Sequence, residues 1–66
     1  MKNTDYIDMW YGDKVENATK IDICFSDCDA QYRGNIYIND KAVGDYQTAD
    51  SLKIEHWFPQ LKICWD

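Results

Sequence analysis

Three segments in the first two thirds of the chain alternate between apolar and polar residues. They are Tyr6–Tyr11, Lys20–Ser26 and Arg33–Asn39. In these segments Ile, Met or Phe recurs at alternate positions, with Asp, Asn, Ser, Cys or Tyr in between. A period of two is the spacing of side chains that share one face of a β-strand. Each segment therefore predicts a strand with one apolar face.

The clearest local signal is the polar run Asn39–Lys41, which has Ile38 on one side and Ala42 and Val43 on the other. Asn and Asp tolerate the positive φ angles that tight turns require. Apolar residues on both sides of such a turn are typical of two strands that pair directly. We predict a tight hairpin centred on Asn39–Lys41.

The C-terminal third admits two interpretations. A helix over Ala49–Trp57 is favoured because Thr48 and Asp50 are residue types that cap helix N-termini and Pro59 ends a helix. Leu52–His56 and Leu61–Trp65 also alternate, however, and together they would form a hairpin. We prefer a short helix followed by a final strand.

At 66 residues the chain has room for one small domain, spanning 1–66, in which a thin core must be rich in large side chains. The predicted fold is α+β, with an antiparallel sheet of about four strands and one short C-terminal helix. A small all-β sheet or barrel is the alternative. The apolar faces of these elements predict a core of Ile7, Met9, Ile21, Ile23, Phe25, Ile36, Ile38, Val43, Ile54 and Trp57.

The net charge of −5 restricts the classes of partner. Direct nucleic-acid binding needs clustered Lys or Arg, and the seven basic residues here are scattered, so we expect none. A basic protein surface remains a suitable partner, while solubility alone would also explain the acidic charge. No apolar stretch approaches the ~20 residues of a membrane span, and the N-terminal residues lack the apolar run of a signal peptide. We expect a cytoplasmic protein with no membrane contact.

The chain has three cysteines and a single histidine. Cys24, Cys28, His56 and Cys64 have the ligand types of a structural zinc site, and a metal would stabilise so small a core. In one continuous strand, however, Cys24 and Cys28 would lie about 13 Å apart, too far for sulfurs on one zinc ion. We therefore expect no cofactor and buried, unreactive thiols, with a zinc-stabilised structural domain as the alternative.

Enzymatic chemistry finds little support in the sequence. The glycines are isolated, so no Gly-rich phosphate loop exists, and a core this small leaves little room for a pocket of about 300 Å³ or more. Asp22, Asp27 and Asp29 lie near two of the thiols and oppose the negative thiolate form. We expect no enzyme, with a thiol redox protein as a further alternative.

The remaining feature is aromatic residues beside acids on the predicted sheet. If the helix covers one face, the other presents Tyr and Trp next to carboxylates, and Tyr and Trp are common anchors of protein interfaces. We therefore predict a small acidic interaction module that binds a basic partner or self-associates as a homodimer. A bacterial or phage accessory protein, such as an inhibitor whose carboxylates replace nucleic-acid phosphates, has this character. The candidate partner-binding residues are Tyr6, Asp8, Trp10, Tyr37, Asp40 and Asp45.

Overall fold

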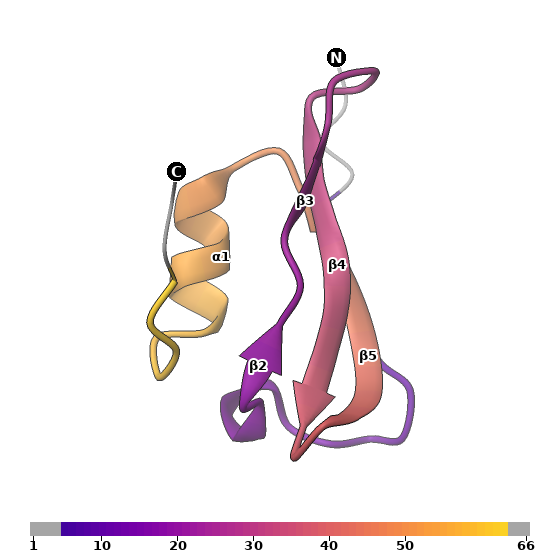
Figure 1. Ribbon diagram of the computed structural model, residues 1–66, viewed down its shortest axis with the longest axis vertical. Helices are drawn as coiled ribbons and strands as arrows, with labels where there is room; N and C mark the ends of the chain where they lie inside the picture. Colours follow the sequence, from indigo (N-terminus) through magenta and orange to yellow (C-terminus); the bar gives the residue numbers. More distant parts are fainter. Residues whose placement is uncertain (1–4, 64–66) are drawn as a thin grey trace.

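The computed structural model describes residues 5–63, which form a five-stranded antiparallel sheet and one short C-terminal helix (Figure 1). The predicted α+β fold is confirmed, with one strand more than expected. The elements are β1 (Tyr6–Met9), the 3₁₀ helix Val15–Asn17, β2 (Lys20–Ile21), β3 (Cys24–Ser26), β4 (Gln31–Ile38), β5 (Lys41–Thr48) and α1 (Ser51–Trp57).

The strand order is β1–β5–β4–β2, and β3 also pairs with β4. The β2 and β3 strands thus occupy one edge, and the single strand predicted over Lys20–Ser26 is interrupted at Asp22 and Ile23, although both parts keep the same register against β4. At Asp22 the chain crosses close to β4, where its carbonyl accepts a hydrogen bond from the buried Tyr46 hydroxyl. Gly34 permits this approach, because a Cβ at that position would lie 2.0 Å from the Asp22 oxygen.

The predicted tight hairpin is confirmed between β4 and β5. Ile38 pairs with Lys41, so the turn has two residues, and Asn39 and Asp40 take φ angles of 52° and 69°. Positive φ at both central residues matches the right-handed twist of the two strands. An irregularity in the pairing next to Ile36 gives β5 one additional residue, Val43, which is buried with the core.

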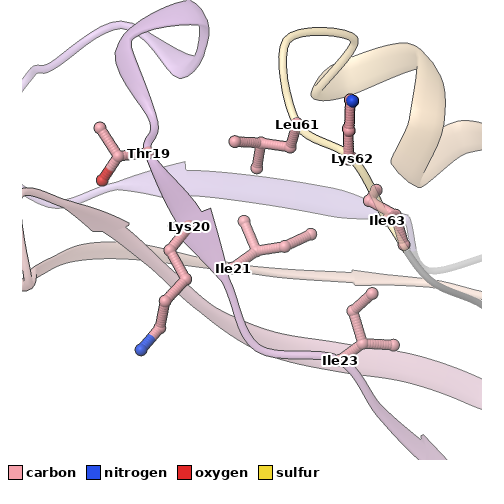
Figure 2. A pocket seen from close by; sticks show the side chains of 7 residues that line it. All are labelled: Thr19, Lys20, Ile21, Ile23, Leu61, Lys62 and Ile63. Carbon is pink, nitrogen blue, oxygen red and sulfur yellow. The ribbon is translucent and has the colours of Figure 1, made fainter.

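Helix α1 lies beside one face of the sheet and covers it (Figure 1). Its Ile54 and the following Phe58 are fully buried against this face, and the Phe58 ring lies 5.9 Å from that of Tyr46. Leu61 and Ile63 extend the cover towards Ile21 (Figure 2). The fully or almost fully buried apolar side chains are Ala18, Ile36, Val43, Tyr46, Ile54 and Phe58.

Two predicted core residues are wrong, because Ile23 is 37% and Phe25 49% exposed. Ile23 lies on the same face as Ile21, because β2 and β3 keep one register against β4, but it falls in the break at the edge of the sheet and stays partly exposed. Phe25 faces the same side as Tyr32, 4.9 Å away between ring centroids. The hairpin that carries both rings extends past the end of α1 in Figure 1, so nothing in the described chain buries Phe25 fully.

The preferred helix in the C-terminal third is confirmed. The Asp50 carboxylate caps α1 by accepting a hydrogen bond of 2.9 Å from the Leu52 amide, and Phe58 ends the helix just before Pro59. Within residues 5–63, no helix has both the length and the apolar character that crossing a membrane requires.

The final strand predicted for Leu61–Trp65 is wrong for its first three residues, which are irregular, and the remainder lies outside the described residues. The Leu61 amide instead closes a turn by donating to the Phe58 carbonyl. The Gln60 side chain donates to the carbonyls of Val15 and Ala18 at 3.2 and 3.1 Å. These bonds hold the segment against the 3₁₀ helix.

Candidate functional site

The sheet face opposite α1 carries no second layer within the described part of the chain. Directly opposed residues in antiparallel strands point to the same face, so the strand register defines the members of this surface, which we call the open face. It comprises Tyr6, Asp8, Lys20, Cys24, Ser26, Gln31, Arg33, Asn35, Tyr37, Ala42, Asp45 and Gln47. Four of the predicted partner-binding residues therefore share it: Tyr6, Asp8, Tyr37 and Asp45.

Asp8 and Asp45 form the most unusual pair on the open face. They are direct cross-strand partners between β1 and β5, and on the other side Asp45 pairs with Asn35. Like charges at directly opposed positions destabilise a sheet. Neither carboxylate has an ion-pair partner among residues 5–63. This acidic pair thus carries two charges that the fold itself leaves uncompensated.

A shallow depression of about 340 Å³ lies beside the acidic pair. Asp45 and Asn35 form part of its lining, together with Tyr6, which is 44% exposed. Cys24 and Arg33 contribute to the same lining. The depression brings the aromatic ring of Tyr6 together with a carboxylate, a carboxamide and the Arg33 cation at the surface.

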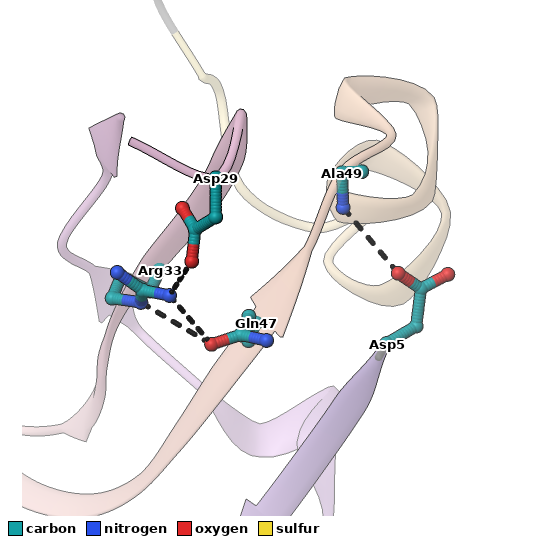
Figure 3. Close-up of polar contacts among 5 residues, drawn as sticks. All are labelled: Asp5, Asp29, Arg33, Gln47 and Ala49. Carbon is teal, nitrogen blue, oxygen red and sulfur yellow. Dashed lines mark hydrogen bonds and ion pairs between the residues drawn. The ribbon is translucent and has the colours of Figure 1, made fainter. Parts of the chain in front are cut away.

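Arg33 does not neutralise the acidic pair, because its guanidinium is engaged elsewhere (Figure 3). Its Nη2 donates to Asp29 at 2.8 Å, and its Nη2 and Nε both donate to the Gln47 side-chain oxygen. These contacts draw the cation towards the β3–β4 turn, where Asp29 lies. The hydrogen bond from Arg33 lowers the pKa of the Asp29 carboxyl below its usual range.

Tyr37 is placed on the open face but is already engaged within the molecule. Its hydroxyl donates to the Asp22 carboxylate at 2.9 Å, and the Lys20 ammonium lies 4.9 Å from its ring centroid. The side chain is half-buried. Of the two open-face tyrosines in the predicted set, Tyr6 therefore has the more accessible ring.

Trp10 and Asp40 lie beyond the acidic pair, at the end of the sheet that carries the β4–β5 turn. The Trp10 amide donates to the Val43 carbonyl, and its ring stands nearly perpendicular to that of Tyr11, at 6.4 Å between centroids. Both rings are exposed, and the Lys41 ammonium lies 5.0 Å from the Tyr11 centroid. The sequence interpretation omitted Tyr11 because its alternation assigned that residue to the apolar side of a longer strand.

The expectation of buried thiols is wrong for the two described cysteines, since Cys24 and Cys28 are both free and exposed. Cys24 lies on the open face and Cys28 in the β3–β4 turn, where the fold provides no cover. His56 is exposed on α1, and Cys64 lies outside the described residues. Between Asp5 and Ile63, no three His, Cys, Asp or Glu side chains are arranged to hold a metal ion.

Comparison with known proteins adds no family to this description. No family model matches the chain, no curated protein matches it, and no solved structure matches it. Its function is therefore inferred from its own residues, of which the acidic pair and the adjoining depression have the most distinctive chemistry.

Proposed function

We propose that the protein is a non-enzymatic interaction module whose open face binds a basic side chain of a partner protein. The observation that carries this proposal is the acidic pair, in which Asp8 and Asp45 stand directly opposite each other on adjacent strands. A guanidinium or ammonium group placed between two carboxylates would remove their mutual repulsion. Binding of such a cation would thus relieve a repulsion between the two carboxylates that remains in the unbound protein.

The acidic pair sets specificity more than total affinity. Solvent-exposed ion pairs contribute only about 0.2–1 kcal/mol each, so two carboxylates alone make a weak site. The exposed ring of Tyr6 supplies contact area beside the pair, and Trp10 and Tyr11 supply more at the end of the sheet. A partner that reaches from Tyr6 to Trp10 would combine aromatic burial with charge recognition.

The acidic charge of the open face disfavours a homodimer formed through it, because two copies would bring like charges together. The exposed free thiols of Cys24 and Cys28 support placement in a reducing compartment such as the cytoplasm. The charge of the open face therefore favours a basic partner protein over a second copy of the chain.

The test compares two variants that lose the same charge, using a fluorescent oligoarginine peptide as the probe. The double variant Asp8→Asn/Asp45→Asn should weaken binding about threefold to tenfold and flatten its salt dependence. The matched control is Asp13→Asn/Glu16→Gln, which removes two exposed acids from the connection between β1 and β2. Equal losses of affinity in both variants would show that the peptide responds only to the net charge of the protein and would contradict the proposal.

The same site variant has an opposite expected effect on stability. Removing the like-charge contact between Asp8 and Asp45 should raise the free energy of unfolding by about 0.2–1 kcal/mol at neutral pH and low salt. Urea denaturation of the site variant and of the Asp13→Asn/Glu16→Gln control measures this difference. A site variant that is less stable than its control would show that the carboxylates support the fold rather than a partner.

A further inference from the structure

A second surface, of opposite character, lies on the other side of the sheet edge. It is a groove of about 240 Å³ between β2 and the chain that follows α1, and its lining combines four aliphatic side chains with Thr19 and two lysines (Figure 2). In Figure 2, Leu61 and Ile63 face Ile21 and Ile23 across it. The groove is smaller than the ~300–1,000 Å³ typical of small-molecule pockets. Its volume instead suits one or two aliphatic side chains that belong to a larger partner.

The groove runs beside a strand that ends the sheet. Among the described strands β2 pairs only with β4, so the other side of its backbone has no strand partner. Edge backbone of this kind accepts an additional strand through main-chain hydrogen bonds. Ile23, which is 37% exposed, extends the apolar wall along the same edge.

Two lysines give the groove a positive rim in an otherwise acidic chain. Lys20 and Lys62 belong to its lining, and Figure 2 shows their side chains extending outward on opposite sides. Neither forms an ion pair with another described residue. The net charge of the chain is −5, so this local sign differs from that of the molecule as a whole.

We propose that this groove binds an extended segment of a partner protein in which aliphatic residues alternate with acidic ones. Such a segment would add to the sheet beside β2. Alternate side chains of a strand point to opposite faces, so its aliphatic residues would enter the groove between Ile21 and Leu61. Its carboxylates would emerge on the open-face side, next to Lys20. Charge complementarity therefore selects acidic over basic segments.

The test uses a fluorescent peptide of alternating Val and Glu, measured by anisotropy against the full chain. Two comparison peptides replace Glu by Lys or place Pro at a central position, which removes a main-chain donor. The Val/Glu peptide should bind at least tenfold more tightly than either. Lys20→Glu should weaken its binding about tenfold, whereas Lys14→Glu, a charge reversal at an exposed lysine outside the groove lining, should have a smaller effect.

Four results would overturn the inference: equal affinity for the Glu and Lys peptides, equal affinity for the Pro peptide, equal effects of the two lysine variants, or no binding at millimolar peptide. A dimer that Lys20→Glu dissociates, without peptide binding, would assign the groove to a second copy of the chain instead. Asp8 and Asp45 lie on β1 and β5, and β4 separates these strands from β2. Asp8→Asn/Asp45→Asn should therefore leave Val/Glu peptide binding within twofold, which separates this test from that of the open face.

Discussion

The substitution Gly34→Ala tests the close crossing of the chain over β4. A Cβ at position 34 would lie 2.0 Å from the Asp22 carbonyl oxygen and 2.6 Å from its carbon, so the Asp22 backbone must move away. That movement would break the bond from the Tyr46 hydroxyl to Asp22 and the 2.9 Å bond from the Asp22 amide to Asn35. The tyrosine hydroxyl would be left without a partner at a fully buried residue.

The free energy of unfolding of Gly34→Ala should fall by about 2–4 kcal/mol, since each hydrogen bond contributes ~0.5–1.5 kcal/mol and a buried unsatisfied group costs ~1–3 kcal/mol. Replacing Gly by Ala also makes the unfolded chain less flexible, which raises the free energy of unfolding by about 0.4–1 kcal/mol and offsets only part of this loss. A protein of 66 residues is stable by about 3–10 kcal/mol. The variant should therefore lose a large fraction of its stability.

Urea denaturation followed by tryptophan fluorescence measures this loss. Tyr46→Phe is the matched comparison, because it removes the hydrogen bond to Asp22 without displacing backbone, and it should cost only about 1 kcal/mol. The double variant should be less destabilised than additivity predicts, since both changes remove the same bond. Gly34→Ala with the stability of the unmodified protein would refute the account of the break between β2 and β3.

Two further predictions concern the β3–β4 turn and the charges around it. Ala30 has a φ angle of 54°, a conformation that favours glycine, so Ala30→Gly should raise the free energy of unfolding by about 1 kcal/mol in urea denaturation. The pKa of Asp29 is lowered by its hydrogen bond from Arg33, and that of Asp5 by its hydrogen bond with Thr48. Their contribution to stability is present above the usual carboxylate pKa and is lost as the pH falls below about 4. Asp29→Asn should therefore reduce the acid sensitivity of unfolding, and an unchanged pH profile would contradict this.

The sequence predicts the elements whose signals are local. Asn39 and Asp40 prefer the positive φ of the hairpin, and Asp50 caps α1 with its own carboxylate, so both elements were predicted from a few neighbouring residues. The break between β2 and β3 depends instead on Gly34, which lies in another strand. No window around Asp22 contains that information.

The same distinction applies to the candidate site. Alternation along β1 and β4 placed Tyr6, Asp8 and Tyr37 opposite the apolar positions. The strand register confirms this orientation, since all three residues lie on the open face. The direct pairing of Asp8 with Asp45 depends on the register between β1 and β5. This register forms only when the first and last strands come together in the folded chain. The exposure of Cys24 follows from the missing second layer on that face, and composition alone favoured burial.

The pairing of Asp8 with Asp45 also joins two parts of the chain that become ordered in different ways. The β4–β5 hairpin closes through a two-residue turn and forms from neighbouring residues, whereas β1 reaches β5 across the whole intervening sequence. The N-terminal side of β1 is held by Asp5, which accepts a hydrogen bond from the Ala49 amide (Figure 3). The Asp5 carboxylate also lies 3.4 Å from the Lys53 ammonium.

The acidic pair therefore exists only while β1 is docked. Any population with β1 detached lowers the apparent affinity for a basic partner in proportion. A partner that contacts both carboxylates must in turn slow the detachment of β1 and protect its backbone amides from hydrogen exchange.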